Sequence, residues 1–238
     1  MSVRASLRPD LRQRETEARE LMDDPDCDRA LLDATYARFP RVNRLVSGWR
    51  GLYRARVRPL LSAGDPVRLL DIGSGGGDIA RSLAGWARED GLRLSITAAD
   101  PDERAYAYAT STPAPAGVEF RRASSSELVA EGASFDIVVS NHLLHHLDPE
   151  ALQSLLADSE RLAPRALHND IERSRLAYTA YAMATRPIAA GSFLHYDGSL
   201  SVRRSYTAPE LRAVAPEGWR VERAAPYRLL LVRQVPSS

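Results

Sequence analysis

A glycine-rich segment at residues 69–80, LLDIGSGGGDIA, holds the residues best suited to bind a ligand. An apolar run leads into Asp71, a cluster of glycines follows, and Asp78 comes directly after the last of them. Glycines let the backbone turn sharply and approach a ligand closely, because no Cβ atoms stand in the way. A dinucleotide-binding fingerprint, Gly-x-Gly-x-x-Gly/Ala, would need a small residue where this chain has Asp78. Two carboxylates would also repel a pyrophosphate, so the segment favours a phosphate-free ligand that carries positive charge.

The run DIGSGGG resembles the Asp-x-Gly-x-Gly-x-Gly signature of class I S-adenosylmethionine-dependent methyltransferases. The resemblance implies S-adenosyl-L-methionine as the cofactor, with S-adenosyl-L-homocysteine as its product. The ammonium and sulfonium groups of that cofactor agree with the two carboxylates. The cofactor-binding residues implied in this segment are Asp71, Gly73, Ser74, Gly75 and Gly77.

The segment SITAADPD, residues 95–102, is similar to the second motif of the same family. There an acidic residue at the end of the second strand binds both ribose hydroxyls, and the matching residue is Asp100. A carboxylate suits a vicinal diol because two donors can meet two acceptor oxygens. The residue that flanks the adenine in the family corresponds to Pro101.

Two further segments complete the resemblance, which covers residues 67–172. In VEFRRASSSEL, Ser124 stands where related enzymes often have an aspartate that accepts from the adenine amino group, and Ser125 follows it. Ser124 is therefore a departure from the pattern, although a hydroxyl can accept the same hydrogen bond. In FDIVVSNHLLHHLDPE, the family pattern places Asn141 beside the methionine part of the cofactor.

All five histidines fall between residues 142 and 195, and histidine is the usual base for deprotonating an acceptor. Methyl transfer from a sulfonium is an in-line displacement, so the protein mainly aligns donor and acceptor. A phenol, with a pKa near 10, reacts well only after its proton is removed. We expect His142, directly after the strand end, or His195, on a glycine-flanked loop, to touch the acceptor.

Two further catalytic candidates have competing structural interpretations. His145 belongs to an LHHL run in which a histidine often packs or caps. Asp170, at the end of the fifth predicted strand, would face the cleft in such a sheet, but it could instead form a salt bridge with Arg173.

The segments HNDIERSRLAY and YDGSLSVRRSYTAPEL resemble bacterial methyltransferases similar to the ubiquinone/menaquinone methylases. Some of these relatives belong to aromatic polyketide pathways, a branch of secondary metabolism. The resemblance implies a small phenolic or quinol-type acceptor. O-methylation is the first expectation, and C-methylation of the same ring is the alternative.

Three other functions compete with this interpretation. Enzymes that methylate adenine or glutamine amides carry Asn/Asp-Pro-Pro-Tyr/Phe after the fourth strand, where this chain has Asn141-His142-Leu143-Leu144. A catalytically silent cofactor-binding protein would keep the same glycine segment. A nicotinamide-dependent dehydrogenase is disfavoured by Asp78.

The elements that must position these residues alternate between strands and helices. Apolar runs begin at residues 67, 92, 118, 135 and 165, and helical segments begin near residues 77, 103, 149 and 173. This alternation predicts an α/β fold with a Rossmann-like, mostly parallel sheet. A helix near residues 207–215 and a C-terminal antiparallel hairpin would complete seven strands, and the stretch after residue 190 is typical of a loop or a hairpin.

The N-terminal region is expected to form a helical cap over residues 1–65, with the methyltransferase core at 66–238. Pro40 and Pro59 predict two or three helices there rather than one. The 238 residues suit one domain, and a formal net charge of +1 does not favour nucleic acid. Cys27 is the lone cysteine, and no apolar run reaches the roughly 20 residues that span a bilayer. We expect a cytoplasmic protein, monomeric or homodimeric, without membrane insertion or a metal.

Overall fold

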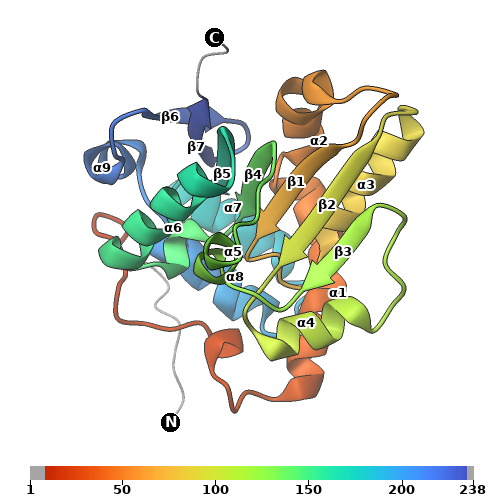
Figure 1. Ribbon diagram of the computed structural model, residues 1–238. Coiled ribbons are helices and arrows are strands. Elements are labelled where there is room, and N and C mark those ends of the chain that lie inside the picture. Colours follow the sequence, from red (N-terminus) through yellow and green to blue (C-terminus); the bar gives the residue numbers. More distant parts are fainter. Residues whose placement is uncertain (1–8, 235–238) are drawn as a thin grey trace.

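A sheet of seven strands organises residues 9–234, the part of the chain that the computed structural model describes (Figure 1). The first eight residues of the expected cap and the last four residues lie outside it. The strand order is β3-β2-β1-β4-β5-β7-β6. The strands are β1 (Val67–Ile72), β2 (Leu94–Ala99), β3 (Val118–Arg121), β4 (Ile137–Asn141), β5 (Arg165–Ile171), β6 (Trp219–Ala224) and β7 (Arg228–Gln234).

Pairing along the sheet is parallel from β3 to β5 and antiparallel beyond it. β7 runs antiparallel to β5, and β6 is antiparallel to β7, so these two strands form the C-terminal hairpin. The predicted Rossmann-like α/β fold with a C-terminal antiparallel hairpin is confirmed. Strand order reverses beside β1, where β2 lies on one side and β4 on the other. In such sheets a ligand binds at the carboxyl ends of the strands beside this reversal.

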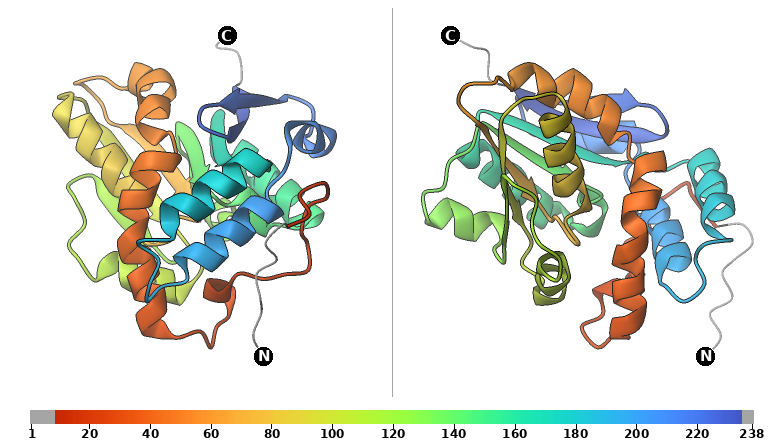
Figure 2. Two further views of the ribbon diagram at one scale, coloured as in Figure 1. Left: turned by 180° about the vertical axis from the view of Figure 1, so that it is seen from behind. Right: turned by 90° about the vertical axis from the view of Figure 1, so that its right-hand side faces the viewer.

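Helices cover both faces of the sheet, as the two views of Figure 2 show. They are α1 (Arg29–Val46), α2 (Trp49–Leu52), α3 (Asp78–Glu89), α4 (Glu103–Thr110), α5 (Ser125–Ala130), α6 (Pro149–Leu162), α7 (Arg175–Thr185), α8 (Leu194–Arg204) and α9 (Ala208–Val214). Single turns lie at η1 (Leu21–Asp23), η3 (Arg58–Leu60) and η4 (Leu144–His146), and η2 (Tyr53–Val57) is a π-helical turn.

Two apolar clusters, one on each face, hold α2, α3, α5, α6 and α9 to the sheet. Leu70 and Val138 pack with α5, α6 and α9, whereas Leu69 and Val139 pack with α2 and α3. Neighbouring residues of a strand point to opposite faces, so a strand buried on both sides is apolar throughout. The continuous apolar runs of the sequence follow from this.

Two local expectations were wrong, and one short helix had not been predicted. The stretch after residue 190 forms helix α8 instead of a loop or a hairpin. Pro40 lies inside α1 and does not end it, although proline removes one intrahelical hydrogen bond. The short helix α5 was not predicted, although Ser124 and Glu127 form a capping box at its start.

Helix α1 of the N-terminal region packs against α4 and the start of α8. Leu32 and Tyr36 of α1 share an apolar cluster with Ala105 and Phe193. The predicted division of the chain at residue 65 remains a prediction. Within residues 9–234, no helix combines the length and the apolar character needed to cross a membrane.

Candidate active site

A cavity of about 370 Å³ lies where β1, β2 and β4 end. Its wall also includes residues of α1, the N-terminal segment before it, and α8. The volume is within the range of small-molecule sites. The structure brings these predicted residues to its wall: Asp71, Gly73, Ser74, Gly75, Asp100, Asn141, His142 and His145.

The glycine turn between β1 and α3 needs its glycines for two different reasons. Gly73 and Gly75 have φ values of 65° and 53°, a left-handed conformation that side chains rarely adopt, and both line the cavity. Gly77 does not line the cavity, and a Cβ there would lie 2.3 Å from the Phe120 ring. Because Gly77 has no side chain, the backbone can pack against Phe120. This packing role differs from the predicted role of Gly77 in cofactor binding. Gly76, which was not predicted, lines the cavity instead.

Three carboxylates give this end of the cavity its electrostatic character. Asp71 is 1% exposed, and within residues 9–234 its Oδ2 has no hydrogen-bond partner. Burial, with Asp78 and Asp100 nearby, raises the pKa of Asp71 well above its ordinary value. Burial also raises the pKa of Asp78, although the Asn43 amide donates to it at 2.9 Å. A buried carboxylate oxygen without a donor is costly, so this end of the cavity favours a cationic ligand group.

Asp100 stands at the end of β2 and shapes the glycine turn. Its Oδ2 accepts from the Gly75 backbone N–H at 2.8 Å, and its Oδ1 accepts from the Asp102 backbone N–H at 2.9 Å. Burial raises the pKa of Asp100 despite these two bonds. Each oxygen keeps a lone pair, so the carboxylate can still accept hydroxyl donors from the cavity. Pro101, the next residue, is exposed and does not line the cavity.

Arg228 fixes the residues at the end of β4, and sequence reasoning missed it. This guanidinium is 2% exposed and donates to Asn169 Oδ1 at 2.9 Å, to Asn141 Oδ1 at 3.2 Å and to His142 Nε2 at 2.7 Å. His142 therefore carries its proton on Nδ1. Burial, followed by the Arg228 charge, lowers the pKa of His142 well below its ordinary value. His142 can donate a hydrogen bond to a ligand, but it is unsuited to the predicted role of base.

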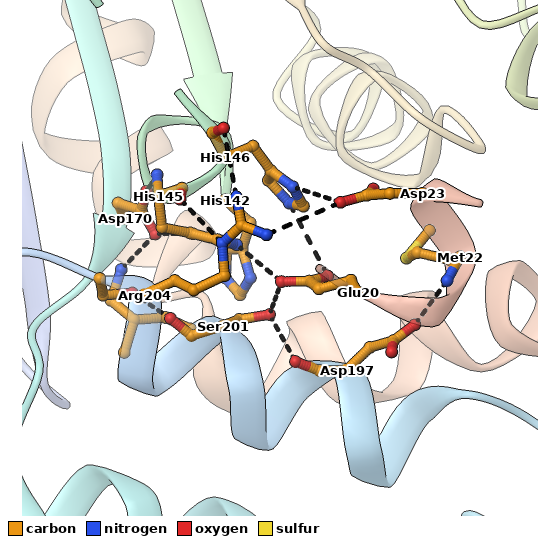
Figure 3. A network of polar contacts seen from close by, with 12 residues as sticks. Glu20, Met22, Asp23, His142, His145, His146, Asp170, Asp197, Ser201 and Arg204 are labelled. Atoms are coloured by element: carbon orange, nitrogen blue, oxygen red, sulfur yellow. Dashed lines mark hydrogen bonds and ion pairs between the residues drawn. The ribbon is translucent and has the colours of Figure 1, made fainter. Parts of the chain in front are cut away.

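His145 sits between two carboxylates on the opposite side of the cavity (Figure 3). Its Nδ1 lies 2.8 Å from Asp170 Oδ1, and its backbone N–H donates to Asp170 Oδ2 at 2.9 Å. Its Nε2 lies 3.5 Å from Glu20 Oε1. Burial opposes protonation, but Asp170 and Glu20 outweigh it and raise the pKa of His145 to about 9. Asp170 lies behind His145 and orients it.

Asp170 does not form the alternative salt bridge with Arg173. The Arg173 guanidinium pairs with Glu210 and donates to the Ser205 carbonyl. Asp170 is also not part of the cavity wall, so neither interpretation from the sequence holds, and its partner is His145.

Three other predicted residues lie outside the cavity wall. Ser124 is the N-cap of α5, and its hydroxyl donates to Glu127 at 2.8 Å. Ser125 donates to Asp158 at 2.8 Å. His195 lies in α8 with its Nδ1 3.1 Å from the Thr185 hydroxyl. These contacts give each side chain a structural partner, so none of the three is placed to touch a ligand in the cavity.

Several cavity residues had no signal in the sequence. Glu20 and Asp23 come from an acidic N-terminal segment, and Asp197 comes from α8. Asp197 accepts from the backbone N–H groups of Leu21 and Met22 at 2.7 and 3.0 Å and so fixes that segment against α8. The place of these residues in the cavity wall depends on contacts between distant parts of the chain, which the sequence does not show.

Comparison with known proteins agrees with this geometry. Residues 69–164 match a family described as a methyltransferase domain. The ubiquinone biosynthesis O-methyltransferase of Caulobacter sp. (strain K31) is 32% identical over 153 residues, which are 62% of this chain and 56% of that protein. The match thus spans about half the length of that relative.

Two solved structures have a similar fold. The plantazolicin methyltransferase BpumL in complex with S-adenosylhomocysteine has a TM-score of 0.61 at 14% identity, over 90% of this chain and 93% of that one. Human N-acetylserotonin methyltransferase in complex with S-adenosylmethionine has a TM-score of 0.61 at 13% identity, over 87% of this chain and 56% of that one.

Proposed function

The chain carries a class I S-adenosylmethionine-dependent methyltransferase domain, and from this premise we propose that it methylates a hydroxyl group of a small phenolic or quinol-type molecule. The observation that carries the proposal is a cavity with two chemically different sides, one with Asp71 and Asp100 at the strand ends and the other with His145 beside apolar side chains. The relative from Caulobacter, a ubiquinone biosynthesis O-methyltransferase, supports the same acceptor class.

The strand-end side fits the cofactor, which supplies a methyl group on a sulfonium. Asp100 would accept hydrogen bonds from the two ribose hydroxyls. Asp71 would face the ammonium group, because its Oδ2 has no donor within residues 9–234. Asn141 and the Nδ1–H of His142 would complete the wall beside the methionine part.

The opposite side combines an apolar surface with a proton acceptor. Ile171, Tyr181 and Leu194 line it, beside His145. Asp170 holds Nδ1 of this imidazole, so Nε2 is the nitrogen left to face an acceptor hydroxyl. The neutral form of His145 is a strong base, suited to a phenol whose pKa is near 10.

The charge of the cavity also restricts the acceptor. Among the described residues that line it there are carboxylates and histidines but no arginine. The charge of protonated His145 is already balanced by Asp170 and Glu20, so an acceptor with a carboxylate or phosphate would meet the remaining carboxylates as like charge, which is unfavourable in a partly enclosed site. Neutral phenols and quinols avoid this cost.

The test is a turnover assay with S-adenosylmethionine and pairs of phenols that differ only by a carboxylate. We expect S-adenosylhomocysteine and a methylated product from the neutral member of each pair, with a lower rate for the charged member. NMR of the product distinguishes O-methylation from C-methylation of the ring.

The variants Asp100→Ala and His145→Gln serve as controls, the first for cofactor binding and the second for turnover. Tight cofactor binding without turnover of any phenol or quinol would contradict the proposal and favour a silent cofactor-binding protein.

A further inference from the structure

Glu20, His145 and His146 form a cluster of potential metal ligands on the acceptor side of the cavity (Figure 3). One ligand atom from each residue lies within 4.8 Å of the other two. Glu20 and His145 are 3% and 1% exposed, so two members of the cluster are buried. The two histidines are neighbours in η4, whereas Glu20 comes from the N-terminal segment.

Both imidazole rings are oriented by a carboxylate on Nδ1. Asp170 Oδ1 lies 2.8 Å from Nδ1 of His145, and Asp23 Oδ2 lies 3.3 Å from Nδ1 of His146. Histidines that bind metals almost always donate the other ring N–H to a carboxylate, a carbonyl or water. Both histidines show this arrangement, His145 with Asp170 and His146 with Asp23.

The two Nε2 atoms converge on one carboxylate. Nε2 of His145 is 3.5 Å from Glu20 Oε1, and Nε2 of His146 is 3.8 Å from Glu20 Oε2. Within residues 9–234, the buried Nε2 of His145 has no hydrogen-bond partner. Its contact with the Glu20 carboxylate at 3.5 Å is not a hydrogen bond, and an ion between the two groups would supply the bond that this buried atom lacks.

The position of Glu20 is fixed by contacts of its own. Ser201 donates to Glu20 Oε1 at 2.7 Å, and Asp197 accepts from the two backbone N–H groups that follow Glu20. Arg14, which precedes Glu20 in the same segment, donates to the His145 carbonyl at 3.0 Å. The N-terminal segment is thus held against both α8 and η4, and it presents Glu20 to the histidines.

We propose that Glu20, His145 and His146 bind a divalent transition-metal ion, and that zinc is the ion this donor set suits best. Two imidazoles and one carboxylate are a known ligand set for catalytic zinc, which keeps a further position open. All three residues line the cavity, so that position would face it. At the open position the ion would bind the acceptor hydroxyl and lower its pKa. The ion, and not the neutral imidazole of His145, would then promote loss of the hydroxyl proton.

The site stands on its own geometry and does not require the proposed methyl transfer. The test therefore uses metal binding to the full-length protein, freed of metal by chelation and without cofactor. Isothermal titration with Zn²⁺ should give one saturable site, and Co²⁺ should give visible absorption bands of nitrogen and oxygen coordination. Zn²⁺ should also raise the midpoint of thermal unfolding, because an ion that binds only the folded state stabilises it.

Two ligand variants and one matched control make the result specific. Glu20→Gln and His146→Gln should each weaken Zn²⁺ binding about tenfold or more, in line with the sensitivity of such sites. His146 is partly exposed, so its variant should fold even if the buried Glu20 variant does not. His195→Gln removes a histidine outside the cavity and should leave Zn²⁺ affinity unchanged.

The absence of saturable Zn²⁺ binding by the unmodified protein would overturn the proposal. Equal binding by the unmodified protein and His146→Gln would overturn it as well, because the ion would then bind elsewhere. Titration of the same proteins with S-adenosylmethionine separates this failure from a failure of the proposed function, since cofactor binding depends on the opposite side of the cavity.

Discussion

Replacing Asp71 by asparagine should weaken cofactor binding and at the same time stabilise the ligand-free protein. The side chain is 1% exposed and lies beside Asp78 and Asp100, whose charges add to the cost of its burial. Asparagine keeps the shape and removes the charge. The repulsion between this position and the two neighbouring carboxylates is then lost.

The size of the binding effect follows from the hydrogen bond that would be lost. A hydrogen bond to a charged group contributes about 1.5–3 kcal/mol, which corresponds to roughly a tenfold to hundredfold increase in Kd. The stability effect has the opposite sign. A carboxyl group whose pKa is raised by folding destabilises the folded state above the unfolded pKa, near 3.9. The gain in unfolding free energy should therefore be present at pH 7 and shrink toward pH 4.

Calorimetric titration of Asp71→Asn with three ligands tests this reasoning. S-adenosylmethionine and S-adenosylhomocysteine both carry the ammonium group and should bind more weakly. Methylthioadenosine lacks the amino-acid part and should bind with unchanged affinity. Urea unfolding at pH 4 and pH 7 measures the stability difference. An equal loss for all three ligands, or a ligand-free variant less stable than the original at pH 7, would refute the assignment of Asp71 to the ammonium group.

Three further predictions concern other parts of the fold. Asp100→Ala should weaken S-adenosylmethionine binding by about 1–3 kcal/mol in a calorimetric titration, and unchanged affinity would remove Asp100 from the ribose site. Burial lowers the pKa of His168 to about 4, so the protein should lose up to about 3 kcal/mol of stability as the pH falls from 6.5 to 4, and urea unfolding of His168→Gln should lack this loss. Gly198→Ala should lower the thermal unfolding midpoint, because its Cβ would lie 1.9 Å from the Tyr181 hydroxyl oxygen. Gly85→Ala, in open space within α3, should raise the midpoint in the same scan, and two shifts of the same sign would contradict the packing argument.

The features that depend on short stretches of chain could be predicted from the amino-acid sequence. Apolar runs specify buried parallel strands, and the glycines after Asp71 specify a turn with left-handed residues. Asp100 and Asn141 come at or directly after strand ends, and parallel strands place these ends along one edge of the sheet. The fold and the strand-end side of the cavity could therefore be predicted from local pattern.

Local pattern also contained a signal that was missed. Ser124 followed three residues later by Glu127 is the start of a helix, and recognising the capping box would have removed Ser124 from the cofactor site. The same spacing would have predicted α5.

Which histidine can act as a base, and which groups surround it, depends on contacts between distant parts of the chain. Arg228 makes His142 a donor, and Asp170 orients His145, whereas His195 turns to Thr185 in α8. Each of these relations depends on side chains from separate elements, and so does the approach of Glu20 to η4. The chemistry of an imidazole depends on the charges and donors within a few ångströms, and these neighbours come together only when distant segments pack.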